Sequence, residues 1–219
     1  KRGAKVVVND LGGNVDGSDD GSLSAAEMVV EEIKAAGGEA MANGASVTDA
    51  DQVKAMVDEV MEKYGRIDIL VNNAGISDGR WQSISEIDME HALEVIEVNS
   101  IAPLLVTQKF QNKMKSGSKL VMMSSLMGSI SDCMSGKSYA YRASKTALNM
   151  FSIAMKNELE SQGISILIMH PGWVETDMGG PNAPLSVEES VNGIMARINE
   201  QTLAMTGRYV QFDGTPIEW

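Results

Sequence analysis

The sequence contains one cysteine, two histidines and few basic residues, and each shortage excludes a class of function. Its 219 residues include 18 Lys and Arg against 30 Asp and Glu, which gives a formal net charge of −12. An acidic surface argues against nucleic acid and against an anionic membrane as partners. No apolar run approaches the roughly 20 residues that a membrane-spanning helix needs. We therefore expect a globular protein that binds neither nucleic acid nor membrane.

The scarcity of thiol and imidazole groups limits disulfide and metal chemistry. Cys133 is the only cysteine, so the chain cannot form an internal disulfide, and a reducing, cytoplasmic location fits. It lies in a polar stretch, where an incidental thiol is the simpler interpretation. His91 and His170 are too far apart in the sequence to suggest a metal pair, so we expect no metal site.

Short apolar runs alternate with helical segments along the whole chain. This alternation predicts an α/β fold with a doubly wound parallel sheet. The chain shows neither internal repeats nor a linker, so we expect one domain over residues 1–219. Pro103 lies inside a long helical segment and predicts a kink there. Strands are expected at 4–10, 39–45, 67–72, 119–123, 164–170 and 208–212, and helices at 22–36, 48–64, 85–115, 138–162 and 186–199.

One stretch, from Val121 to Lys145, concentrates the side chains that suit proton transfer. An apolar strand ends at Ser124 and Ser125, and a helix later begins with Tyr141 and Lys145 in its first turns. Residues four apart share one face of a helix. A lysine ammonium beside a phenol favours the phenolate, so the pair predicts a Tyr141 pKa lowered from about 10 toward the range of a general acid–base. The serine hydroxyl completes a plausible proton-transfer site.

Five motifs, in this order and spacing, resemble the short-chain dehydrogenase/reductase family. They are N-N-A-G at 72–75, Asn99 within V-N-S-I-A-P, S-S-L-M-G at 124–128, Y-R-A-S-K at 141–145, and H-P-G-W-V-E-T at 170–176. The resemblance covers nearly the whole chain. It implies a Rossmann-like fold and an oxidoreductase that transfers a hydride between a nicotinamide cofactor and a carbonyl or alcohol substrate.

The resemblance also implies four catalytic residues. Tyr141 would give its proton to the carbonyl oxygen as the hydride arrives. Lys145 would lower the tyrosine pKa and hold the nicotinamide ribose. Ser125, the second serine of the family's S-S-x-x-G pattern and therefore preferred over Ser124, would stabilise the developing oxyanion. Asn99 would hold a helix kink and a water that links the lysine to solvent.

The expected cofactor site follows the ends of several strands. Asp10 would accept hydrogen bonds from the adenosine ribose and repel a 2′-phosphate, and it is followed by Leu11 instead of a basic residue, so NAD is expected in preference to NADP. Ser46 and Val47 stand where the family usually has Asp-Val at the adenine, and the serine departs from that pattern. The other expected cofactor contacts are Asn73, Ala74, Gly75, Tyr141, Lys145, Pro171, Gly172, Val174 and Thr176.

The family's first strand, glycine-rich turn and first helix have no counterpart in the sequence. The segment G-G-N-V-D-G at 12–17 has the wrong spacing for a phosphate-binding turn and follows the run that matches the family's second strand. Roughly 30 residues, about one crossover unit, are thus expected to be missing. We expect a gap in the sheet between the strands at 4–10 and 67–72, and weak cofactor binding if the unit is truly absent.

Two alternatives to a carbonyl reductase or alcohol dehydrogenase stay open. The segment V-V-V-N-D-L-G-G at 6–13 is similar to the (3R)-hydroxyacyl-CoA dehydrogenase unit of multifunctional enzymes, whereas 139–145 and 170–174 are similar to the C-factor and small carbonyl reductase branch. The other alternative is a non-catalytic binding or signalling module, and the full set of four catalytic residues argues against it. Relatives commonly pair through the helices expected at 85–115 and 138–162, which implies a homodimer or homotetramer.

Overall fold

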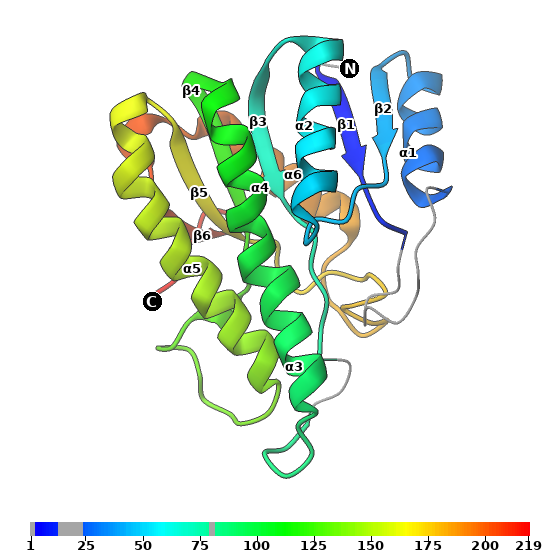
Figure 1. Cartoon of the computed structure of the whole chain (residues 1–219). Helices are drawn as coiled ribbons and strands as arrows, with labels where there is room; N and C mark the ends of the chain where they lie inside the picture. The colour runs from blue at the N-terminus through cyan, green and yellow to red at the C-terminus, as the bar shows by residue number, and fades with distance from the viewer. Residues whose placement is uncertain (1–2, 13–23, 79–81) are drawn as a thin grey trace.

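Parallel strands alternate with helices along the chain, as the sequence pattern predicts (Figure 1). The computed structural model describes residues 3–12, 24–78 and 82–219. The α/β fold class is confirmed. Its strands are β1 (Lys5–Asn9), β2 (Glu39–Asn43), β3 (Ile67–Asn72), β4 (Met114–Met123), β5 (Ser165–His170) and β6 (Arg208–Gln211). Its α-helices are α1 (Ser24–Ala35), α2 (Ala50–Tyr64), α3 (Met89–Ile96), α4 (Ala102–Phe110), α5 (Tyr139–Leu159) and α6 (Val187–Glu200).

The strands form two parallel sheets instead of one continuous sheet. β1 pairs with β2, and the second sheet has the order β3-β4-β5-β6. Within the described residues, no strand pairs with both β1 and β3 (Figure 1). The interruption lies where the sequence analysis expects a gap. On β3, the side chains of Ile69 and Val71 are 46% and 44% exposed, although strands of parallel sheets are usually buried on both faces.

Side-chain caps fix the beginnings of several helices, among them α2 and α6. The Asp49 carboxylate accepts hydrogen bonds from the backbone N–H groups of Asp51 and Gln52 at the start of α2. Ser186 and Glu189 form a capping box before α6, in which each side chain bonds the other residue's backbone. These polar residues satisfy N–H groups that have no partner within the helix.

The segment expected as one long helix at 85–115 is divided. Asp88 caps α3, so the helix begins later than expected. A five-residue π-helical stretch, Glu97–Ile101, separates α3 from α4. Pro103 is the second residue of α4, directly after this π-helical stretch. The irregularity is therefore a π turn around Asn99, and the segment then ends in a 3₁₀ turn, with β4 starting at Met114.

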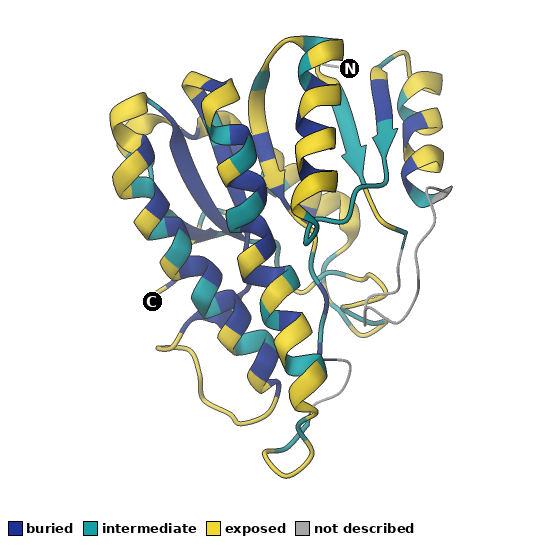
Figure 2. Cartoon of the chain, in the orientation of Figure 1, coloured by how far each residue is buried: buried dark blue, intermediate teal, exposed yellow. Residues whose placement is uncertain are grey.

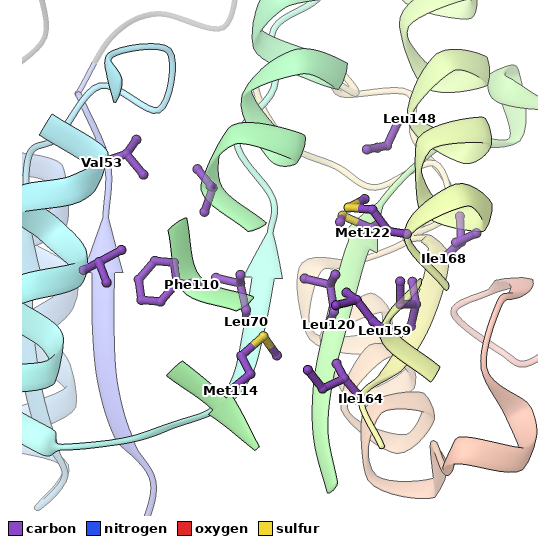
Figure 3. Packing of buried hydrophobic residues seen from close by; sticks show 14 of the residues in the cluster. Val53, Leu70, Phe110, Met114, Leu120, Met122, Leu148, Leu159, Ile164 and Ile168 are labelled. Atoms are coloured by element: carbon purple, nitrogen blue, oxygen red, sulfur yellow. The ribbon is translucent and has the colours of Figure 1, made fainter. Parts of the chain in front are cut away.

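The main hydrophobic core lies between the β3–β6 sheet and the layer formed by α2, α4 and α5 (Figures 1 and 2). Figure 3 shows Leu120, Met122 and Ile168 in this core, beneath Leu148 of α5. Alternate residues of β4 and β5 point to the opposite face, where they pack against Ile198 of α6. This two-sided packing fixes the ends of β4 and β5. In the described ranges, no helix combines the length and the apolar composition needed to cross a bilayer.

Candidate active site

The expected catalytic residues meet at the carboxyl end of β4. Ser125 follows this strand, and Tyr141 and Lys145 lie in the first two turns of α5. Asn99 belongs to the π-helical stretch that packs beside α5. Asn99, Ser125 and Lys145 are buried, and Tyr141 is partly buried. Three segments that are distant in sequence, namely the end of β4, α5 and the π-helical stretch, therefore bring together a hydroxyl, a phenol, an amine and an amide.

Lys145 is buried and bonded to the backbone of β4. Its Nζ donates a hydrogen bond to the carbonyl oxygen of Met123 at 2.9 Å and lies over the Tyr141 ring, 5.6 Å from its centroid. Burial lowers the pKa of Lys145 to about 8, because an ammonium is disfavoured away from water. The amine is therefore mostly protonated at pH 7 and can exchange a proton near neutral pH.

The expected lowering of the Tyr141 pKa is wrong. Burial of the phenol raises its pKa, a hydrogen bond with Ser125 opposes this shift, and the negative charge of Asp78 raises the pKa further. Lys145 does not reverse the effect because its ammonium lies over the ring face and is held by the Met123 carbonyl. Tyr141 is consequently a neutral phenol, which is the protonation state of a proton donor.

Asn99 ties the turn after β3 to α5. Its Oδ1 accepts a hydrogen bond from the Ile76 N–H at 2.8 Å, and its Nδ2 donates to the Ile76 carbonyl at 2.8 Å. The same Nδ2 donates to Ser144 Oγ at 3.0 Å. The π turn that presents Asn99 is a helix irregularity often found at functional sites. Asn99 thus holds both walls of the site in place.

Two glycines allow close approach of backbone segments to these side chains. A Cβ on Gly75 would lie 3.1 Å from Asn99 Oδ1 and 3.4 Å from Lys145 Nζ. A Cβ on Gly128 would lie 3.0 Å from the Lys145 Cβ and 3.1 Å from Asn149 Nδ2. A larger residue at either position would displace an expected catalytic side chain or the loop that follows Ser125.

The residues expected to hold the adenosine end of a cofactor follow β1 and β2. The exposed Asp10 accepts a hydrogen bond from the Gly12 N–H through Oδ1 at 2.6 Å, and Leu11 is also exposed. Ser46 Oγ lies 2.9 Å from Thr48 Oγ1, and Val47 packs against the core. In Figure 1, β1, β2 and β3 point in the same direction, so their carboxyl ends lie toward one side of the molecule.

The other expected cofactor contacts lie in turns after β3 and β5. Asn73, Ala74 and Gly75 directly follow β3, whereas Pro171, Gly172, Val174 and Thr176 follow β5. The second turn is internally bonded. Thr176 Oγ1 accepts from the Gly179 N–H at 3.1 Å and lies 3.3 Å from the Val174 carbonyl oxygen, while Trp173 Nε1 donates to the Gly179 carbonyl at 2.7 Å. These bonds give a defined shape to the loop that follows β5.

Sequence reasoning missed a polar network behind Ser125. Ser124 Oγ donates to Asn149 Oδ1 at 2.6 Å, and Asn149 Nδ2 donates to the Gly128 carbonyl at 3.2 Å. The hydroxyl of Tyr209, on β6, donates to the Ser125 carbonyl oxygen. Asn149 lies four residues after Lys145 on the same helix face, which was a usable signal. Tyr209 carried no such signal, because it is 84 residues from Ser125.

Comparisons with known proteins identify the family to which the chain belongs. Residues 13–184 match the short chain dehydrogenase family. C-signal from Myxococcus xanthus is 36% identical over 157 residues, covering 71% of this chain and 94% of C-signal. The 1-hydroxy-2-glutathionyl-2-methyl-3-butene dehydrogenase of Rhodococcus sp. (strain AD45) is 30% identical over 190 residues, covering 84% and 83%. The NADPH-bound carbonyl reductase from chicken fatty liver superposes with a TM-score of 0.85 at 27% identity, with both chains fully covered.

The chain therefore belongs to the short-chain dehydrogenase family and is an oxidoreductase. Its similarity to C-signal and to carbonyl reductases confirms the expected C-factor-like branch. Members of this family bind nicotinamide cofactors and act on small molecules. The observed fold is thus the one expected for this family, and the family's reaction class is oxidation and reduction.

Proposed function

We propose that this protein interconverts a small-molecule carbonyl compound and its alcohol, with Tyr141 as the general acid–base. The observation that carries the proposal is the neutral, partly buried Tyr141 phenol, hydrogen-bonded to Ser125 and lying beneath the Lys145 ammonium. The three groups provide a proton donor, an oxyanion donor and a positive charge within one cluster. Such a cluster suits a reaction in which a carbonyl oxygen gains negative charge.

The residues at the carboxyl ends of the strands fit a nicotinamide cofactor. The exposed Asp10 carboxylate at the end of β1 offers an acceptor for ribose hydroxyls, and the turn at Gly75 has no side chain where it approaches Lys145 and Asn99. When bound, the cofactor supplies or accepts the hydride. The residues proposed to hold it are Asp10, Leu11, Ser46, Val47, Asn73, Ala74, Gly75, Tyr141, Lys145, Pro171, Gly172, Val174 and Thr176.

The chain's own residues would divide the remaining work. The Ser125 hydroxyl would donate a hydrogen bond to the substrate oxygen, and Tyr141 would deliver the proton that converts this oxygen into an alcohol. Lys145 would favour the phenolate left on Tyr141 after the transfer. Asn99 would fix the distance between α5 and the turn that follows β3, because it bonds Ser144 on the helix and Ile76 in the turn.

A preference for NAD over NADP is the finer part of this proposal. Asp10 supports it, because a carboxylate at the end of this strand repels a 2′-phosphate, and Leu11 offers no positive charge. The chicken fatty liver carbonyl reductase, which shares the fold, is an NADPH-bound protein. The ratio of kcat/KM for NADH to that for NADPH decides between the two cofactors.

The decisive experiment replaces Tyr141 with Phe and follows oxidation of NADH and NADPH with a panel of ketones, aldehydes and 3-oxoacyl thioesters. Loss of the proton donor should reduce kcat by about 10²- to 10⁴-fold. Tyr139→Phe is the matched control, since Tyr139 is partly exposed and lies two residues away on the same helix. Equal activity of wild type and Tyr141→Phe would contradict the assigned role.

A non-catalytic signalling module is the second candidate, favoured by the similarity to C-signal. It predicts that the protein binds neither NADH nor NADPH, which a fluorescence titration measures directly. A preference for 3-oxoacyl thioesters over simple ketones would instead support the hydroxyacyl-CoA dehydrogenase alternative. The two results are distinguishable, because the first eliminates catalysis altogether and the second changes only the substrate.

We also propose a homodimer or homotetramer that pairs through the helical segments that precede and follow β4 in the sequence, expected at 85–115 and 138–162. Met89 and Leu93 of α3 are exposed by 70% and 71%, and Met150 of α5 by 67%. Large apolar side chains gathered on neighbouring helices are typical of a subunit interface. Light scattering measures the mass in solution, and a monomer at micromolar concentration would contradict this part of the proposal.

A further inference from the structure

The last residues of the chain contact the loop that carries Ser125. We call Tyr209, Ile217, Glu218 and Trp219 the C-terminal clamp. Tyr209, on β6, is 3% exposed, and its hydroxyl donates a hydrogen bond to the Ser125 carbonyl oxygen. Its ring stacks on Trp219 with 5.2 Å between ring centroids and an interplanar angle of 30°. One tyrosine therefore joins the expected oxyanion donor to the last residue of the chain.

The clamp also holds the residues that follow Ser125. Ser129 Oγ donates to the Glu218 carbonyl at 2.6 Å. Ser131 donates twice to the Trp219 carbonyl, through Oγ at 2.6 Å and through its backbone N–H at 3.0 Å. The loop from 125 to 131 is thus fastened at three residues by a segment about 80 residues later in the sequence.

The clamp is itself anchored to the sheet. The Ile217 N–H donates to the Tyr209 carbonyl at 2.9 Å, and Ile217 is buried in the main core. Burial raises the pKa of Tyr209, so its hydroxyl keeps the proton that it donates to Ser125. The loop's opposite side is held by α5, where Thr146 Oγ1 donates to the Gly128 carbonyl at 3.0 Å. The loop is therefore fixed between α5 and the clamp.

We propose that Tyr209 and Trp219 are positioning residues for carbonyl reduction, which hold the Ser125 backbone so that the Ser125 hydroxyl meets Tyr141 and the substrate oxygen. The inference rests on the proposed function, because it assigns the clamp a catalytic effect only through Ser125. A hydrogen-bond donor that moves by about 1 Å can lose a large part of its effect on the transition state. The clamp prevents that movement from the side opposite α5.

The test is a double-mutant cycle that combines Tyr209→Phe with Ser125→Ala. Tyr209→Phe keeps the ring and its stacking on Trp219 and removes only the hydroxyl. We expect kcat to fall about tenfold with KM changed less than about twofold, because the interaction acts in the transition state. In the Ser125→Ala background, Tyr209→Phe should lower kcat by less than about twofold, since the group it positions is gone.

Two further variants separate positioning from general destabilisation. Tyr64→Phe is the matched control, because the Tyr64 hydroxyl is buried but has no hydrogen-bond partner among the described residues and lies at the end of α2. It should leave kcat unchanged. Trp219→Ala should lower kcat, whereas Trp219→Phe, which retains an aromatic ring for Tyr209, should restore most of it. Equal effects of the two Trp219 variants would overturn the assigned role of stacking.

Hydrogen exchange of peptides that span residues 125–131 measures how firmly the clamp holds this loop, and it does not depend on enzymatic activity. These amides should exchange faster in Tyr209→Phe and Trp219→Ala than in Tyr64→Phe. The proposal is overturned if exchange is unchanged, or if Tyr209→Phe lowers kcat equally in the wild-type and Ser125→Ala backgrounds. A wild type that reduces no carbonyl would overturn the proposed function and the positioning role together, whereas an active wild type with a silent Tyr209→Phe would overturn the clamp alone.

Discussion

The two parallel sheets differ in how completely their strands are buried. On β5, residues 165–169 are all buried, whereas residues 6–9 of β1 are only partly buried (Figure 2). Both strands are short apolar runs of the kind that is typical of parallel sheets covered on both faces. The difference therefore arises from what packs around each strand and not from the strand's own composition.

The candidate site is likewise divided between the two sheets. Ser125, Tyr141 and Lys145 are held by β4 of the four-stranded sheet and by α5, which packs on that sheet. Asp10 and Ser46 follow the strands of the two-stranded sheet. Proton transfer requires reacting groups held to within about 0.5 Å, which a close-packed core can provide. We therefore expect changes around β4 and β5 to affect catalysis, and changes around β1 and β2 to affect cofactor affinity.

The largest expected effect is on stability, and it compares one apolar residue from each sheet. Ile168→Ala on β5 should lower the free energy of unfolding by about 2–5 kcal/mol, because Ile168 is fully buried and the substitution leaves a cavity. Val7→Ala on β1 should cost only about 1 kcal/mol, because Val7 is partly exposed. Urea unfolding measures both values, and equal losses would show that β1 is as well packed as β5.

The next prediction uses the buried Lys145 of α5, which packs against the four-stranded sheet. The pKa of Lys145 is about 8 in the folded protein against a usual 10.5, so the unfolded chain binds more protons between these pH values. Stability conferred at this position should rise from pH 8 to pH 10.5, by at most about 1.4 kcal/mol per pH unit. Unfolding measured across this range should show the rise in wild type and its loss in Lys145→Met.

A matched lysine from the other sheet controls for the general effect of alkaline pH. Lys5→Met removes an exposed ammonium from β1, where it pairs with Glu39 at 3.5 Å. This variant should keep the rise seen in wild type. A rise that persists in Lys145→Met, or one that disappears in both variants, would contradict a charge penalty specific to the buried amine.

Much of the fold could be predicted because its signals are local. Apolar runs mark the six strands, and the pair Ser186 and Glu189 marks the start of α6 by spacing alone. A kink in the 85–115 segment was expected at Pro103 and Asn99, but its form as a π turn was not, because a π turn depends on what Asn99 bonds across the site and not on helix propensity. Local signals therefore locate elements more reliably than they locate breaks within an element.

The candidate site could also be predicted only in part. Asn99, Ser125, Tyr141 and Lys145 lie close together in the structure, as the family motifs imply. The direction of the Tyr141 pKa shift could not be predicted, because it depends on how deeply the phenol is buried and on the placement of Lys145, whose Nζ is bonded to the Met123 carbonyl and lies over the phenol ring. Such tertiary details decide electrostatics and leave no pattern in the sequence.

The smallest expected effects, on the pH profile and on cofactor preference, come from replacing the carboxylates of Asp78 and Asp10. The charge of Asp78 raises the Tyr141 pKa, so Asp78→Asn should lower that pKa. Because carbonyl reduction needs the protonated phenol, the alkaline limb of the kcat profile should move to lower pH. Asp10→Asn, beyond β1, should leave this limb in place and instead improve kcat/KM for NADPH relative to NADH. If Asp10→Asn moved the alkaline limb as far as Asp78→Asn, the division of labour between the two sheets would be wrong.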